Sequence, residues 1–75
     1  MAVFSIEGIE YWMHSGESGE DRWNLECYRL DDKEQCLMEI SVNEDGSDWE
    51  FRTYVVSLPL ALVKAVIEEA ERRLP

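Results

Sequence analysis

Residues 35–54 read QCLMEISVNEDGSDWEFRTY, and this stretch decides the fold class. Apolar and polar residues alternate from Cys36 to Val42 and again from Trp49 to Val55, a pattern typical of half-buried strands. Between the two runs lies an Asp-Gly pair, which is a strong hairpin signal when alternating residues flank it. The stretch therefore predicts two antiparallel strands joined by a tight turn.

Two further strands are predicted upstream of this hairpin. Trp23, Leu25 and Cys27 alternate with polar residues, and residues 31–34 form a short charged turn. Residues 3–13 alternate imperfectly, with a change of phase at Gly8 that predicts a bulge or bend inside one strand. Residues 14–21 are polar and glycine-rich, so we expect a loop there.

Downstream of residue 57 the apolar period becomes helical. Ser57 is the expected N-cap and Pro59 the expected first-turn residue. The predicted apolar stripe comprises Val63, Val66, Ile67, Ala70 and Leu74. The predicted ion pairs on the exposed side are Lys64–Glu68, Glu68–Arg72 and Glu69–Arg73.

The predicted fold is one α+β domain over residues 1–75, a four-stranded antiparallel meander with a C-terminal helix packed on one face. The predicted core consists of Ile6, Trp23, Leu25, Met38, Ile40, Phe51, Val63, Val66, Ile67 and Ala70. One helix covers only one face of such a sheet, so the other face is left open for function.

Charge narrows the classes of partner. The chain has 17 acidic and 7 basic residues, a formal net charge of -10, and the whole imbalance lies before residue 58. Such a charge disfavours direct binding to nucleic acid or to an anionic membrane. Residues 1–7 show no basic region and no long apolar stretch, so a cytoplasmic location is expected.

The acidic residues fall into two predicted groups. In a meander the first and third loops lie at the same end, which groups Glu17, Glu20, Asp21, Glu44, Asp45 and Asp48. Period-2 alternation places a second set on the open face if Trp23, Cys36 and Phe51 face the helix: Glu10, Glu26, Glu39 and Glu50, together with Trp12, Tyr28, Tyr54 and Leu37. Carboxylates around aromatic side chains suit a protein–protein contact. The alternative is that the acid mainly keeps the protein in solution and its edges free of aggregation.

The sequence gives little indication of a metal, cofactor or catalytic site. His14 has no second histidine, and Cys27 and Cys36 read as free, buried thiols rather than zinc ligands. Residues 43–50 resemble a calcium loop only superficially, because the glycine and the closing glutamate are misplaced. We expect no cofactor, no metal site and no enzymatic activity.

The leading hypothesis is therefore a non-catalytic acidic domain that occupies a basic surface of a partner protein, in place of nucleic acid in one version. Small phage inhibitors such as anti-CRISPR proteins are similar in size, charge and layout, without a diagnostic motif, and an immunity protein against a basic toxin belongs to the same class. The alternative is a homodimeric assembly module that pairs through a sheet edge or through residues 55–58. The chain is expected to be a monomer or a homodimer.

Overall fold

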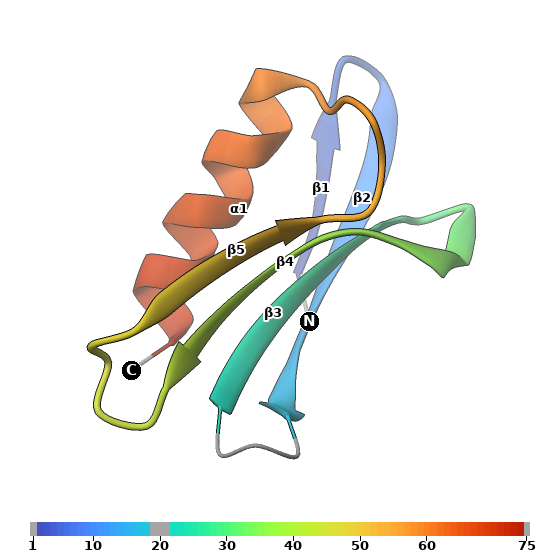
Figure 1. The fold of residues 1–75 in the computed structure, drawn as a ribbon. Coiled ribbons are helices and arrows are strands. Elements are labelled where there is room, and N and C mark those ends of the chain that lie inside the picture. The colour runs from blue at the N-terminus through green and yellow to red at the C-terminus, as the bar shows by residue number, and fades with distance from the viewer. Residues whose placement is uncertain (1, 19–21, 75) are drawn as a thin grey trace.

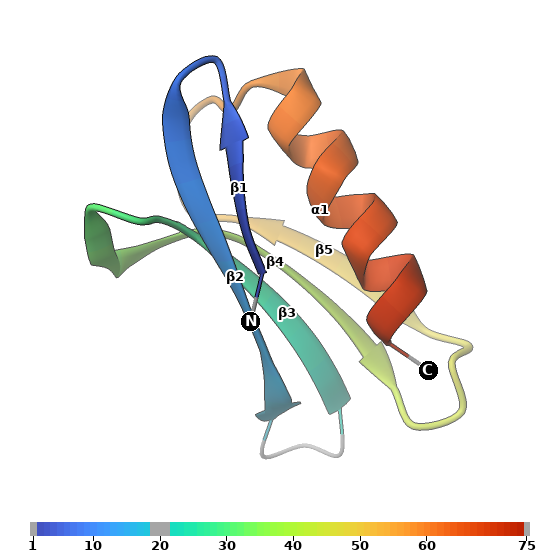
Figure 2. The ribbon, with the colours of Figure 1, turned by 180° about the vertical axis from the view of Figure 1, so that it is seen from behind.

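The structure is an antiparallel sheet with one helix across one of its faces (Figure 1). The computed structural model describes residues 2–18 and 22–74, and for residues 2, 17 and 18 it describes the backbone alone. The five strands lie side by side in chain order: β1 (Ala2–Ile6), β2 (Ile9–Ser18), β3 (Arg22–Arg29), β4 (Asp32–Asn43) and β5 (Trp49–Thr53). Helix α1 spans Leu60–Arg73 and lies in front of the sheet in Figure 2.

The antiparallel α+β prediction is confirmed, but the strand number was wrong: the sheet has five strands rather than four. The first predicted strand is two strands, because Glu7 and Gly8 have φ angles of 52° and 83° and reverse the chain. Two consecutive positive φ values are those of a type I′ turn, the turn whose twist suits a two-residue hairpin. Gly8 therefore ends a strand instead of bending one.

The predicted loop at residues 14–21 was also too long. Strand β2 continues through Ser18, and His14 lies opposite Glu26 of β3. The described part of this connection resumes at Arg22, which pairs with both Ser18 and Asn43. The end of β2 at Ser18, the start of β3 at Arg22 and the β4–β5 turn therefore lie at the same end of the sheet (Figure 1), as the meander predicts.

A bulge in β4 changes which side chains face the helix. Cys27 pairs with Met38 but Tyr28 pairs with Cys36, so Leu37 is the extra residue. Leu37 packs against the core, whereas Cys36 lies opposite Tyr28 and shares its face of the sheet. The predicted positions of Leu37 on the open face and Cys36 on the helix side were therefore wrong.

The core lies between α1 and the three central strands. Its buried members are Tyr11, Met13, Leu25, Cys27, Met38, Ile40, Val42, Leu62, Val66, Ala70 and Leu74, with Phe4, Ile6, Leu37, Leu58 and Val63 partly buried around them. Three predicted core residues are instead exposed: Trp23 at 39%, Phe51 at 52% and Ile67 at 42%. A helix about 10 Å wide cannot cover five strands spaced about 4.8 Å apart, so Phe51 on the edge strand β5 stays exposed.

The helix begins later than expected. Pro59 occupies the N-cap position, without a side-chain hydrogen bond, so the prediction of Ser57 as N-cap was wrong. The stripe toward the sheet comprises Leu62, Val66, Glu69 and Ala70. Glu69 is 9% exposed and pairs with Arg72 and Arg73, which corrects its placement on the exposed side. Among residues 2–18 and 22–74, no helix is long and apolar enough to cross a membrane.

Candidate functional site: the open face of the sheet

The face of the sheet away from α1, called here the open face, carries an aromatic pair at its centre. Trp12 of β2 lies opposite Tyr28 of β3, and their rings stack with centroids 5.2 Å apart and planes 22° apart. The His14 ring is 5.8 Å from Trp12, and the Lys33 ammonium lies 5.6 Å from the centre of the Trp12 ring, a cation–π distance. Trp12 and Tyr28 are half-buried, so they offer contact area without being fully exposed.

The indole nitrogen of Trp12 is the one polar side-chain atom in the described residues that is buried without a hydrogen-bond partner. Burying a donor without an acceptor costs about 1 to 3 kcal/mol. Hydrogen bonds join the other central polar groups of this face, which are Asn24, Glu26, Tyr28, Glu39 and Tyr54.

Two carboxylates flank the aromatic pair. Glu26 and Glu39 are direct cross-strand partners on β3 and β4, where like charges repel. Glu39 accepts hydrogen bonds from the Asn24 amide at 2.7 Å and from the Tyr54 hydroxyl at 3.0 Å. Glu26 accepts a hydrogen bond from the Tyr28 hydroxyl at 3.3 Å. These donors orient the two carboxylates.

This environment raises the pKa values of the Tyr28 and Tyr54 hydroxyls. Burial, followed by the nearby Glu26 carboxylate, raises the pKa of Tyr28 to about 12. Burial also raises the pKa of Tyr54, although a hydrogen bond with Arg52 acts in the opposite direction. Both hydroxyls are therefore neutral donors at ordinary pH.

Arg22 connects the open face to the end that carries the β4–β5 turn. Its guanidinium lies 3.0 Å from the Asp48 carboxylate and 3.7 Å from Glu50, and it donates to the Asp48 carbonyl at 2.8 Å. The Arg22 side chain is only 15% exposed. Asp48 and Glu50 are therefore partly neutralised, unlike the free carboxylates that the sequence suggested.

The β4–β5 turn is built by side chains that accept backbone hydrogen bonds. Asn43 accepts from the amides of Ser47 and Asp48, each at 3.0 Å. Asp45 accepts from the Ser47 hydroxyl and amide, which lowers its pKa. Glu44 and Asp45 are exposed, so this turn presents its carboxylates to solvent. These hydrogen bonds are those of a hairpin turn, as the Asp-Gly signal predicts.

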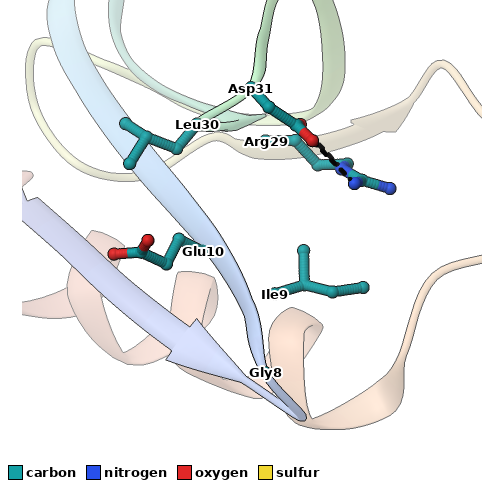
Figure 3. A pocket seen from close by; sticks show the side chains of 6 residues that line it. All are labelled: Gly8, Ile9, Glu10, Arg29, Leu30 and Asp31. Atoms are coloured by element: carbon teal, nitrogen blue, oxygen red, sulfur yellow. Dashed lines mark hydrogen bonds and ion pairs between the residues drawn. The ribbon is translucent and has the colours of Figure 1, made fainter.

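The structure brings together most of the predicted site residues. Glu26, Tyr28, Glu39, Glu50, Tyr54 and Trp12 share the open face, and Glu44, Asp45 and Asp48 share the β4–β5 turn. Glu10 points to the opposite side of β2 from Ile9 (Figure 3) and is exposed. Glu17 is described by its backbone alone, opposite Trp23, and Glu20 and Asp21 lie outside the described residues.

Sequence reasoning missed four contributors to this face: Arg22, Asn24, His14 and Lys33. Two of them had a usable signal, because Arg22 and Asn24 alternate with Trp23 and Leu25 and must point away from the helix. Lys33 lies beyond the strand alternation, in the region of the bulge, where period-2 counting does not apply.

An open hollow of about 310 Å³ lies at the other end of the sheet, lined by Gly8, Ile9, Glu10, Arg29, Leu30 and Asp31 (Figure 3). Arg29 pairs with Asp31 at 2.9 Å, and this hydrogen bond lowers the pKa of Asp31. This pair accounts for two of the three charged side chains that line the hollow, and Glu10 is the third. In the described residues no group of three or more His, Cys, Asp or Glu side chains could hold a metal ion.

Comparison with family models, with curated proteins and with solved structures finds no match to this chain.

Proposed function

We propose that this chain is a non-catalytic acidic domain that binds a basic surface of a partner protein through its open face. The observation that carries the proposal is the stacked Trp12–Tyr28 pair with Glu26 and Glu39 beside it. Aromatic side chains at the centre and charged groups around them are the composition of energetically important contact regions.

The net negative charge of the chain supports a basic protein as the partner. A net charge of -10 on 75 residues steers association with a basic protein and makes its rate sensitive to salt. A phosphate-rich ligand is disfavoured by the same charge. A partner whose basic surface normally binds nucleic acid fits this description, as do the targets of small phage inhibitors and of immunity proteins. A cytoplasmic location belongs to the same proposal.

The buried indole nitrogen of Trp12 gives the proposal a specific contact. A partner carbonyl or carboxylate would satisfy this donor once the side chains that cover it, such as Lys33 over the ring, move aside. We therefore place the centre of the contact at Trp12 and its rim at the carboxylates.

The experiment begins with affinity capture of the partner from host extract, followed by association kinetics at several salt concentrations. The test variant reverses Glu10 and Glu26 together, because Glu26 accepts one hydrogen bond, from Tyr28, whereas Glu39 accepts two, from Asn24 and Tyr54, and its reversal would disturb the fold more. The matched control reverses Glu68 and Glu71, which are exposed on α1. Glu69 is unsuitable as a control because it is buried.

The expected result is a fall in association rate of about tenfold or more for the sheet variant, with a weaker dependence on salt, and little change for the helix variant. Trp12→Ala should mainly speed dissociation. If the helix variant loses binding and the sheet variant keeps it, the acid of the open face serves solubility alone and the proposal fails.

A further inference from the structure

Strand β5 forms one edge of the sheet and carries exposed apolar side chains. Trp49 is 44% exposed and Phe51 is 52% exposed on this strand, and Ile67 of the neighbouring helix is 42% exposed. Trp49, Phe51 and Ile67 line an open groove of about 200 Å³ together with Ile40, Ala70 and Glu71. A sheet edge with exposed aromatics is a template for pairing with another strand.

The backbone groups that β5 leaves unpaired can be identified. Asp48 and Tyr54 make backbone hydrogen bonds to β4, to Asn43 and Leu37 respectively. Since antiparallel strands bond through alternate residues, the amides and carbonyls of residues 50 and 52 also face β4. Those of Trp49, Phe51 and Thr53 therefore point outward, and their side chains lie on the helix side of the sheet, as Phe51 lies opposite Ile40.

The sequence of β5, WEFRT, is complementary to itself when it is read antiparallel about Phe51. In that alignment Phe51 lies opposite Phe51 of a second copy, and Glu50 lies opposite Arg52 in both directions. The two charge pairs fall on the open-face side, and the aromatic pair falls on the helix side. Aromatic pairs and opposite charges that face each other across strands both stabilise a sheet.

The antiparallel alignment also separates the acidic turns. Asp48 of one copy lies opposite Tyr54 of the other, so the two β4–β5 turns are at opposite ends of the junction. A parallel alignment would place Glu50 opposite Glu50 and Asp48 opposite Asp48. Like charges opposite each other are destabilising, and each chain already carries a net charge of -10.

We infer that two copies of this chain associate through β5, antiparallel about Phe51, to form one continuous sheet. The other edge is less suitable: Phe4 and Ile6 of β1 are partly buried in the core and the sequence AVFSI offers no charge pair. The short strand limits the interface, so the dimer is weak and reversible.

The test measures self-association by analytical ultracentrifugation at about 0.15 M ionic strength, where charges beyond about 8 Å are screened. The unmodified chain is expected to show a concentration-dependent dimer. Phe51→Asp should weaken self-association at least tenfold. Val3→Asp is the matched control, because Val3 is 49% exposed on β1, and it should leave the dimer unchanged.

Two charge variants test the register. Glu50→Arg alone and Arg52→Glu alone each place like charges opposite one another and should each weaken self-association about tenfold or more. An equimolar mixture of these two variants restores opposite charges at both positions, so it should dimerise again. Thermal unfolding of each variant checks that the monomer remains folded, because within one copy Glu50 lies near Arg22 and Arg52 lies opposite Glu39.

A chain that stays monomeric up to about 1 mM, which corresponds to roughly 4 kcal/mol of binding free energy, overturns the inference. So does loss of the dimer in Val3→Asp but not in Phe51→Asp, or failure of the mixed charge variants to associate.

Discussion

Glu26 and Glu39 lie directly opposite each other on β3 and β4, each with its own hydrogen-bond donors. Two carboxylates in this arrangement repel, and Asn24, Tyr28 and Tyr54 offset that repulsion. The strand phase that sends Glu39 to the open face sends its neighbour Ile40 into the core, where it is 6% exposed. Substitutions at Glu39 and Ile40 therefore compare the contribution of the open face to stability with that of the core.

Ile40→Ala is expected to lower the free energy of unfolding by about 2 to 5 kcal/mol, because it removes buried methyl groups and leaves a cavity. Glu39→Ala should cost less, since the loss of two hydrogen bonds is accompanied by relief of the repulsion from Glu26. Urea unfolding of both variants makes the comparison. A larger loss for Glu39→Ala than for Ile40→Ala would contradict the strand phase.

The β1–β2 turn is expected to respond to substitution in opposite directions at its two positions. Glu7→Asn should stabilise the domain by several tenths of a kcal/mol to about 1 kcal/mol, because asparagine tolerates the left-handed conformation better than glutamate. Gly8→Ala should destabilise it by about 1 kcal/mol, since alanine is strained at a φ of 83° even though space is open around it. Thermal unfolding measures both. Equal and small effects would indicate a turn of another type.

The two cysteines are free and should differ in reactivity. Burial raises the pKa of Cys27 to about 12, and it also raises the pKa of the half-buried Cys36. Because the thiolate is the reactive form, Cys36 should alkylate slowly at pH 8 and Cys27 more slowly still in the folded protein. Mass spectrometry after unfolding should find two adducts. A mass about two daltons low that reductant restores would show a disulfide instead.

Stability should fall at alkaline pH. The pKa of Cys27 rises from 9.0 to about 12 on folding and that of Tyr28 from 10.0 to about 12. The folded state thus holds these protons more tightly, so their stabilisation is complete below about pH 9 and is lost as the pH rises toward 12. Cys27 contributes at most about 1.4 kcal/mol per pH unit, and Tyr28 contributes less because solvent screens it.

Urea unfolding between pH 8 and pH 10.5 measures this loss. The variants Cys27→Ala and Tyr28→Phe should each show a shallower pH dependence than the unmodified chain, whatever their stability at pH 8. The slope is therefore the readout, since Cys27→Ala also changes core packing. An unchanged slope in both variants would show that other groups cause the alkaline loss.

The sequence predicted β3, β4, β5 and the helix because each has a regular period and a clear turn signal. It did not predict the first hairpin, because a Glu-Gly turn lacks the usual Asn-Gly or Asp-Gly signature and glutamate seldom adopts a positive φ. It misplaced Cys36 and Leu37 because one extra residue in β4 reverses every position before it. Period-2 reasoning has no means of locating such a residue.

The sequence likewise predicted one part of the candidate site and missed another. Alternation alone placed Glu26, Glu39, Tyr28 and Trp12 on one face. The neutralisation of Asp48 and Glu50 by Arg22 could not be predicted, because it depends on the register between β3 and β4. Burial of Phe51 was wrongly expected because the pattern shows which face a side chain takes, not how far the helix extends over that face.

The order of the strands also has a consequence for how the chain folds. Every strand in the sheet pairs with its neighbour in the chain, so each hairpin closes a short loop and loses little chain entropy as it forms. The distant contacts are those of α1 with the central strands. Low contact order speeds folding, and the helix, whose core contacts are with strands distant in the chain, is the element whose docking completes the core. We expect the hairpins of the sheet to form before the helix docks on them.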